Sequence, residues 1–123
     1  MNEIEYFFDS YAIIEVLKSN PSYQKFSEII AVSSRINLVE VAYHLLESFG
    51  QEEGLKILNS LKIKILEIGE KDVSKIAIFR KQNSQKKFSY IDCIGYVLAK
   101  ENNLKFLTGD NAFKGMENVE FVK

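Results

Sequence analysis

The sequence has few residues of the types that build disulfides and zinc sites, and each shortage excludes a kind of site. Cys93 is the only cysteine and His44 is the only histidine. An internal disulfide therefore cannot form, and there is no ligand set for a structural zinc site. Any metal that the protein binds must be held mainly by oxygen.

Long apolar runs are also missing. Charged or turn residues interrupt every apolar stretch well before the roughly 18 residues that span a bilayer. The first residues, Met1 to Glu5, are acidic, where a secretory signal would begin basic and continue apolar. These absences predict a cytoplasmic protein without a membrane span. With 123 residues and 46% hydrophobic content, we expect a single domain over residues 1–123 with one sizeable core.

The formal charge of −1 argues against a generally basic nucleic-acid binder, but the charge is unevenly distributed. Nine acidic and four basic residues give residues 1–60 a net charge of −5, which leaves +4 for the remainder. No acid occurs between Val73 and Ile91. The positive charges of that segment are Lys75, Arg80, Lys81, Lys86 and Lys87. They indicate either a phosphate-contacting surface or a solvated helix face followed by a basic loop.

Short apolar segments alternate with helical patterns along the chain. We expect strands at residues 4–8, 29–32, 62–68 (near a sheet edge), 104–107 and 119–122. Helices are expected over residues 11–18, 21–28, 38–49, 52–61, 70–82 and 90–102, with a loop at 82–87. Gly50 should end the helix over 38–49. The alternation is typical of an open parallel sheet covered on both faces.

The apolar positions also predict which helix faces point inward. For the helix over 38–49 they are Leu38, Val41, Ala42, Leu45, Leu46 and Phe49. For the helix over 70–82 they are Val73, Ile76, Ala77 and Phe79. Glu40 then falls on the opposite, polar face of its helix.

Four acidic residues are candidates for a functional site. Asp9 and Asp110 follow predicted strands, and in open parallel sheets ligands bind outside the carboxyl ends of strands. Asp92 is the only charged residue between Ser89 and Ala99, and a carboxylate in such apolar surroundings needs a partner. Each acid also has a structural interpretation: Asp9 as a helix N-cap, Asp92 as a capping-box residue, Asp110 in a turn and Glu40 in solvent. Both interpretations remain open for each residue taken singly.

The only histidine and the only cysteine have plain interpretations. His44 lies one turn after Glu40 and could reach a substrate, although a lone histidine on a polar helix face usually has no special role. Cys93, next to Asp92, is interpreted as a small core residue.

Four segments together resemble PIN domains. Tyr6 to Ile14 is similar to the opening strand and turn of that family, and Asn37-Leu38-Val39-Glu40 to its acid-bearing helix. Ser89-Tyr90-Ile91-Asp92 resembles the family's serine or threonine three residues ahead of an aspartate. Leu104 to Phe113 resembles its closing strand, TxD turn and following aromatic residue. The order and spacing of the segments agree over essentially the full chain.

Two positions depart from the family pattern. Ala112 stands where many members carry a second acid two residues after the last aspartate, and Tyr11 replaces a small residue two positions after the first. These departures affect the expected number of metals and the shape of the site. The four principal acids are all present.

The resemblance implies both a fold and an activity. The fold is a three-layer α/β/α sandwich with a central, mainly parallel sheet of four to five strands. The activity is that of a metal-dependent endoribonuclease with Asp9, Glu40, Asp92 and Asp110 at its site. Four converging carboxylates need a cation between them, and oxygen-only ligation suits Mg²⁺ or Mn²⁺.

Roles for individual residues follow from this hypothesis. Asp9, Asp92 and Asp110 are expected to contact the metal or its waters, with Glu40 as a further ligand or a water-orienting base. Ser10 and Thr108 are accessory candidates. The expected contacts with the RNA backbone are Lys75, Arg80, Lys81, Lys86 and Lys87.

Compact relatives of this length resemble VapC-type toxins of toxin–antitoxin pairs, so the resemblance also implies a homodimer and a small antitoxin partner. Tyr11, Ile14 and Leu17, or Tyr43 and Phe49, are candidates for such interfaces, and core packing explains them equally well.

Other functions share parts of this sequence pattern. An RNA-processing PIN nuclease without an antitoxin shares every catalytic residue, and a catalytically inactive PIN-like binding module shares the fold. A phosphoacceptor signalling domain needs an acidic pair after the first strand, where Asp9 stands alone. A phosphatase of the haloacid dehalogenase type needs a second aspartate where Tyr11 stands.

Overall fold

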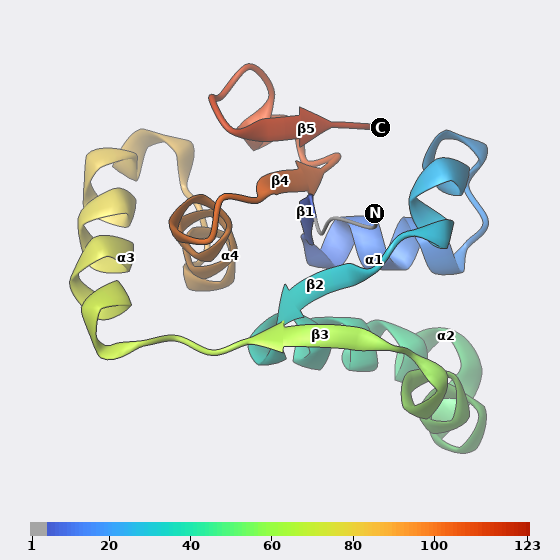
Figure 1. Cartoon of the computed structure of the whole chain (residues 1–123). Helices are drawn as coiled ribbons and strands as arrows, with labels where there is room; N and C mark the ends of the chain where they lie inside the picture. The colour runs from blue at the N-terminus through green and yellow to red at the C-terminus, as the bar shows by residue number, and fades with distance from the viewer. Residues whose placement is uncertain (1–4) are drawn as a thin grey trace.

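Five short apolar segments form one sheet in the computed structural model, which describes residues 5–123 (Figure 1). The strands are Tyr6–Phe8 (β1), Ala31–Ser34 (β2), Ile63–Leu66 (β3), Lys105–Thr108 (β4) and Val119–Phe121 (β5). Their order is β3-β2-β1-β4-β5, and every neighbouring pair is parallel. The prediction of an α/β fold with a mainly parallel sheet of four to five strands is confirmed, with β3 at an edge.

Helical segments connect the strands. The α-helices are Ser10–Leu17 (α1), Arg35–Ser60 (α2), Glu70–Gln82 (α3) and Tyr90–Glu101 (α4). The 3-10 segments are Pro21–Glu28 (η1), Ser84–Lys86 (η2) and Asn111–Phe113 (η3). Among residues 5–123, no helix is long and apolar enough to cross a membrane.

Two cores, where one was expected, lie on opposite faces of the sheet, because neighbouring residues of a strand point to opposite sides. Phe7 and Phe106 pack with α4 on one face. Phe8 and Leu107 pack with α1, η1 and α2 on the other. These helix layers on either side of the sheet make the predicted three-layer sandwich.

Helix α4 lies very close to the sheet. A Cβ added at Gly95 would be 2.9 Å from Cε1 of Phe106 and 3.0 Å from Cε1 of Phe7, so only glycine fits without a shift of the rings. Cys93 on the same helix is fully buried, which confirms its interpretation as a core residue. The start of α4, which carries Asp92, is therefore held in a defined place relative to β1 and β4.

The second strand begins later than its apolar residues predict. We expected residues 29–32, but Ile29 and Ile30 are 40% and 53% exposed, and β2 begins at Ala31. Its buried polar end is stable because the Ser33 hydroxyl donates to the Phe8 carbonyl at 2.8 Å. The hydroxyl of Ser34 likewise donates to Oδ1 of Asn37.

The segment after Asn20-Pro21 is helical where predicted, but it is a 3-10 helix. Asn20 caps it by accepting a hydrogen bond from the Ser22 backbone N–H at 2.9 Å. Its two buried residues, Tyr23 and Phe26, are three positions apart, which places them on one side of a helix with three residues per turn.

The predicted inward faces of two helices are partly wrong. In α2, Val41 and Leu45 are buried, whereas Leu46 and Phe49 are 37% and 55% exposed. Gly50 interrupts this helix with a φ of 81°, as its predicted role as a terminator requires, although a second helical stretch follows directly. In α3, Ile76 is buried, but Val73 is 61% exposed and Ala77 is exposed as well. Each helix therefore packs over a narrower stripe than its apolar content indicates, α2 against the sheet and α3 against α4.

The remaining boundaries agree within one to three residues. Ile4, where the first strand was expected to begin, lies outside the described residues.

Candidate active site

Asp9 and Asp110 lie at the same edge of the sheet because β1 and β4 are parallel neighbours. Phe8 pairs with Leu107, and the backbone N–H of Asp9 donates to the Leu107 carbonyl at 3.0 Å. Each aspartate follows the carboxyl end of its strand. This is the edge at which open parallel sheets bind ligands.

Asp9 is a buried carboxylate with two short hydrogen bonds. Its Oδ1 accepts from the backbone N–H of Ser10 at 2.8 Å, as expected of the N-cap of α1. Its Oδ2 accepts from the hydroxyl of Thr108 at 2.7 Å. Burial is the main reason that the pKa of Asp9 rises to about 7, and the negative charges of Asp92 and Glu40 raise it further.

A chain of polar contacts connects Asp9 to Glu40 on α2. Ser10, next to Asp9, donates its hydroxyl to Oε1 of Glu40 at 2.6 Å. The amide of Asn37 donates to the Ser10 hydroxyl at 2.9 Å. Although Glu40 is exposed, its carboxylate is therefore directed toward α1. Of the two interpretations left open for Glu40, this contact favours a role beside α1.

Asn37 is a residue that sequence reasoning passed over. It is fully buried and holds Ser10 from one side, while its Oδ1 accepts from the Ser34 hydroxyl. An asparagine one turn before a candidate acid is the only sequence signal for this role. We regard Asn37 as a positioning residue for Ser10 and Glu40.

Asp92 occupies the third position of α4 and forms the predicted capping box with Ser89. Its Oδ2 accepts from the Ser89 backbone N–H at 2.9 Å, and its own N–H donates to the Ser89 hydroxyl at 3.0 Å. Burial raises the pKa of Asp92, the hydrogen bonds to Ser89 lower it, and the charge of Asp110 raises it. Asp92 is thus close enough to both Asp9 and Asp110 to repel them.

Asp110 is placed by a tight turn after β4. Its backbone N–H donates to the Thr108 hydroxyl at 3.1 Å, and its Oδ1 accepts from the Ala112 N–H at 3.0 Å. Gly109, between Thr108 and Asp110, has no room for a Cβ, because the Tyr11 ring and the Val122 carbonyl lie against it. Tyr11, which departs from the family pattern, therefore packs against this turn.

Within residues 5–123, no lysine, arginine or histidine side chain forms an ion pair with any of the four acids. The ion pairs found there involve Glu15, Glu67, Glu101 and Glu117. No three His, Cys, Asp or Glu side chains in that range are grouped closely enough to enclose a metal directly. Mg²⁺ needs only one or two direct carboxylates, because it keeps several of its waters. An all-oxygen set with a buried, uncompensated Asp9 fits such an ion.

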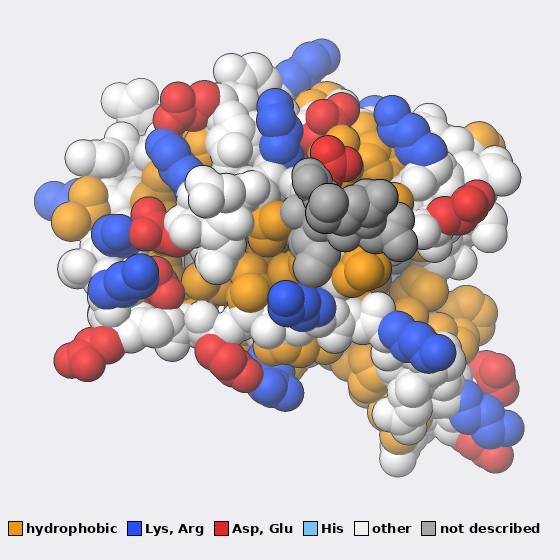
Figure 2. Space-filling view, in the orientation of Figure 1, with side chains coloured by type: hydrophobic (Ala, Val, Ile, Leu, Met, Phe, Trp, Pro, Cys, Tyr) orange, Lys and Arg blue, Asp and Glu red, His pale blue; other side chains and the backbone are white. Residues whose placement is uncertain are grey.

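The predicted RNA-contacting residues differ in their surroundings. The Lys75 ammonium pairs with Glu101 at 2.6 Å, which neutralises it. Lys86 reaches the Ala112 carbonyl at 3.1 Å, beside the turn that carries Asp110. The other three residues, Arg80, Lys81 and Lys87, line one cavity. On the face of the molecule that Figure 2 shows, basic and acidic side chains are interspersed.

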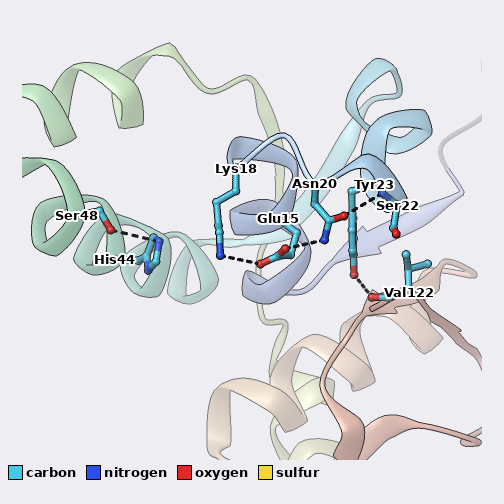
Figure 3. A network of polar contacts seen from close by, with 8 residues as sticks. All are labelled: Glu15, Lys18, Asn20, Ser22, Tyr23, His44, Ser48 and Val122. Carbon is cyan, nitrogen blue, oxygen red and sulfur yellow. Dashed lines mark hydrogen bonds and ion pairs between the residues drawn. The ribbon is translucent and has the colours of Figure 1, made fainter.

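His44 has a local partner only. Its Nε2 is 3.5 Å from the Ser48 hydroxyl, one turn further along α2 (Figure 3), and it makes no hydrogen bond to the four acids. Figure 3 also shows the Tyr23 hydroxyl donating to the Val122 carbonyl. This contact holds the end of the chain beside Gly109.

The residues proposed for interfaces fall into two groups. Tyr11, Ile14 and Leu17 are partly buried against the core that contains Phe8, so core packing accounts for them. Tyr43 and Phe49 are 63% and 55% exposed and remain candidates for contact with another chain.

Comparisons with known proteins agree with the fold. The sequence model of the PIN domain family matches residues 6–119. A comparison with curated proteins found no match. Among solved structures, VapC20 of Mycobacterium tuberculosis, described as a sarcin-ricin loop cleaving toxin, is similar with a TM-score of 0.77 and 12% identity, over 97% of this chain and 100% of that one.

Two complexes give similar values. VapBC2 from Rickettsia felis, bound to a fragment of its promoter DNA, has a TM-score of 0.73 and 20% identity over 98% of this chain and 100% of that one. A toxin–antitoxin complex from Klebsiella pneumoniae has a TM-score of 0.73 and 18% identity over 94% and 96%. At these identities the likeness establishes the fold.

Proposed function

The chain belongs to the PIN-domain family, and from this premise we propose that it is a metal-dependent endoribonuclease with Asp9, Glu40, Asp92 and Asp110 at its active site. The observation that carries the proposal is the buried Asp9 carboxylate. Burial and the charges of Asp92 and Glu40 all raise its pKa, and no basic side chain pairs with it within residues 5–123. Such a site favours a bound divalent cation.

Asp9, Asp92 and Asp110 would hold the metal or its waters, and Glu40 would be a further ligand or orient a water. When bound, Mg²⁺ or Mn²⁺ activates water for attack on the phosphodiester and neutralises charge on the phosphate oxygens. This chemistry does not require a histidine as general base.

Neighbouring residues of the chain hold these acids in position. Thr108 donates to Asp9 and accepts from the N–H of Asp110, so one hydroxyl joins the two strand-end acids. Ser10 donates to Glu40. Precise placement of ligating groups is itself a large part of metal-assisted catalysis.

We further propose that the protein is the toxin of a toxin–antitoxin pair, a cytoplasmic single-domain protein that forms a homodimer and binds a small antitoxin. The similarity of its fold to VapC20 and to the VapBC complexes supports this assignment. An RNA-processing nuclease without an antitoxin is the second candidate, since the acids would be the same.

The test is cleavage of a labelled, mixed-sequence RNA by the purified protein, freed of any copurified inhibitor, with and without Mn²⁺ or Mg²⁺. We expect cleavage that requires metal and falls by about a hundredfold or more in Asp92→Asn. The asparagine side chain of this variant would keep the hydrogen bond from the Ser89 N–H, so the fold should be retained.

Asp72→Asn is the matched control. Asp72 has the same capping position in α3, where its Oδ2 accepts from the Gly69 N–H at 2.7 Å. Its replacement should leave the cleavage rate unchanged. Absence of cleavage by the folded wild-type protein in every metal condition would favour the inactive binding module instead.

A further inference from the structure

A basic cavity lies between the last turns of α3 and the start of α4. It has a volume of about 280 Å³, and its lining includes Arg80, Lys81, Ser84, Lys87 and Tyr90. None of its lining residues is acidic. The cavity therefore combines three positive charges with an aromatic ring.

Tyr90 is held in place but remains accessible. The guanidinium carbon of Arg80 lies 4.1 Å from the centroid of the Tyr90 ring, and Nε of Arg80 donates to the Phe88 carbonyl at 3.2 Å. Tyr90 is nevertheless 63% exposed. A buried aromatic residue would serve the core, whereas this ring is supported from one side and open to solvent.

The cavity is connected to the proposed active site through the loop before α4. Tyr90 begins the helix that carries Asp92, and at about 100° per residue the two side chains point to different sides of α4. The loop that leads to it is fixed against the turn carrying Asp110, because the Phe88 and Phe113 rings stack with centroids 4.4 Å apart. Lys86 of the same loop donates to the Ala112 carbonyl. The loop thus joins the cavity to the turn that carries Asp110, and a strand of RNA bound at the four acids would reach the cavity by passing around the start of α4.

We infer that the cavity is a nucleotide subsite for single-stranded RNA, in which Tyr90, supported by Arg80, stacks on a base while Lys81 and Lys87 contact the adjoining phosphates. The inference rests on the proposed function in that it assumes an RNA substrate. Aromatic and guanidinium planes recognise unstacked bases. An acidic protein segment would use the cations but not the exposed ring, and duplex RNA keeps its bases inside the helix.

The experiment measures RNA binding separately from cleavage. Fluorescence anisotropy in EDTA gives the Kd of a short labelled single-stranded RNA for the wild-type protein and for Tyr90→Leu and Tyr90→Phe. We expect Tyr90→Leu to raise Kd by about tenfold and Tyr90→Phe, which keeps the ring, to bind about as tightly as the wild type.

An oligonucleotide lacking bases at internal positions distinguishes stacking from charge. It should bind the wild type more weakly than the intact RNA does, and Tyr90→Leu should weaken its binding little further, because the stacking contact is already absent. Lys87 has a left-handed φ of 57°, which asparagine tolerates. Lys87→Asn should reduce the dependence of log Kd on log salt by about 0.7.

Two controls match these variants. Phe49 is exposed to a similar extent, at 55%, and at about 100° per residue it lies roughly opposite Glu40 on α2, so Phe49→Leu should leave RNA binding unchanged. Lys75 is already paired with Glu101, so Lys75→Gln should leave the salt dependence unchanged.

The inference is wrong if Tyr90→Leu, shown by circular dichroism to be folded, binds RNA as tightly as Phe49→Leu. It is also wrong if Tyr90→Leu weakens binding of the abasic and intact strands equally, or if a poly-glutamate peptide binds through Tyr90 while RNA does not. RNA binding that depends on Tyr90, without cleavage in Mn²⁺, would refute the nuclease and leave the subsite standing. RNA cleavage and RNA binding that are both unchanged in Tyr90→Leu would refute the subsite and leave the nuclease standing.

Discussion

The first turns of α3 and α4 have almost the same local geometry and quite different surroundings. In both, an aspartate at the third helical position accepts from the backbone N–H of the residue before the helix, Asp72 from Gly69 at 2.7 Å and Asp92 from Ser89 at 2.9 Å. For Asp92, burial raises the pKa and the charge of Asp110 raises it further. Capping accounts for one carboxylate oxygen of each aspartate, Oδ2 in both, and only tertiary neighbours make Asp92 a candidate ligand.

The two helices also differ in what they pack against: α4 lies on the sheet, whereas α3 packs against α4. Most of α4 from Cys93 to Ala99 is buried, whereas Asp72 and Ile76 are the buried residues of α3. Val73 and Ile78 of α3 are more than half exposed. A ligand on α4 is therefore carried by a rigid element, which is what a metal site requires.

The largest difference between the two aspartates should be in metal binding. At a free Mn²⁺ concentration roughly a hundred times Kd, metal should stabilise the wild type and Asp72→Asn by about 2.7 kcal/mol. If Asp92→Asn lowers affinity about a hundredfold, its stabilisation falls to about 0.4 kcal/mol. Thermal unfolding with and without Mn²⁺ measures this without relying on activity, and equal shifts in the two variants would remove Asp92 from the site.

The next effect concerns the sixth position of each helix. Gly95→Ala should lower the free energy of unfolding by about 1–3 kcal/mol, because the new methyl group would press on the Phe7 and Phe106 rings. Lys75 has the same position in α3, and Lys75→Ala should cost less than about 1 kcal/mol, since it removes only a partly exposed ion pair with Glu101. Urea unfolding of both variants tests the comparison, which fails if their losses are similar.

A smaller effect is expected at the N-cap of α4. Ser89→Ala removes the hydroxyl that accepts from the Asp92 N–H and should destabilise the protein by about 1 kcal/mol. Ser89→Thr should restore most of the loss because threonine also caps. Urea unfolding of the two variants measures this difference. Unchanged stability in Ser89→Ala would mean that the hydrogen bond from the Ser89 N–H to Asp92 holds the cap by itself.

The smallest change would make α3 resemble α4. Gly69 has an extended conformation, with φ −85° and ψ 164°, which serine adopts readily. Gly69→Ser would supply the missing side-chain cap and should stabilise the protein by a few tenths of a kcal/mol, with no gain in metal binding. A gain in Mn²⁺ affinity in this variant would contradict the view that capping and ligation are separate properties.

Much of the fold was predictable, because it depends on short-range patterns. The alternation of apolar strands and helices, the capping box at Ser89 and the interruption at Gly50 each depend on a few neighbouring residues, and the structure confirms them. The buried faces of helices α2 and α3 were less predictable. Val73 and Phe49 look like core residues in the sequence, yet they are 61% and 55% exposed and lie outside the contacts that their helices make with the rest of the fold.

The candidate site was predictable as a set of residues and not as an arrangement. Resemblance to PIN domains selected its four acids, and their joint role in metal binding stays a prediction. Asn37 was missed because a buried asparagine has no periodic or charge signal of its own. The pairing of Lys75 with Glu101, which takes it out of the proposed RNA surface, also required the packing of α3 against α4.

The sequence by itself determined the helix caps, the strands and the parallel α/β class, since these follow from residues within one or two turns of each other. The tertiary structure alone decided that Thr108 binds Asp9, 99 residues away, and that Ser10 binds Glu40, 30 residues away. It also decided that Asp92, unlike Asp72, lies where its charge raises the pKa of Asp9. Burial and Coulomb repulsion depend on distance in space, and a sequence specifies that distance only once the sheet has brought its strands together.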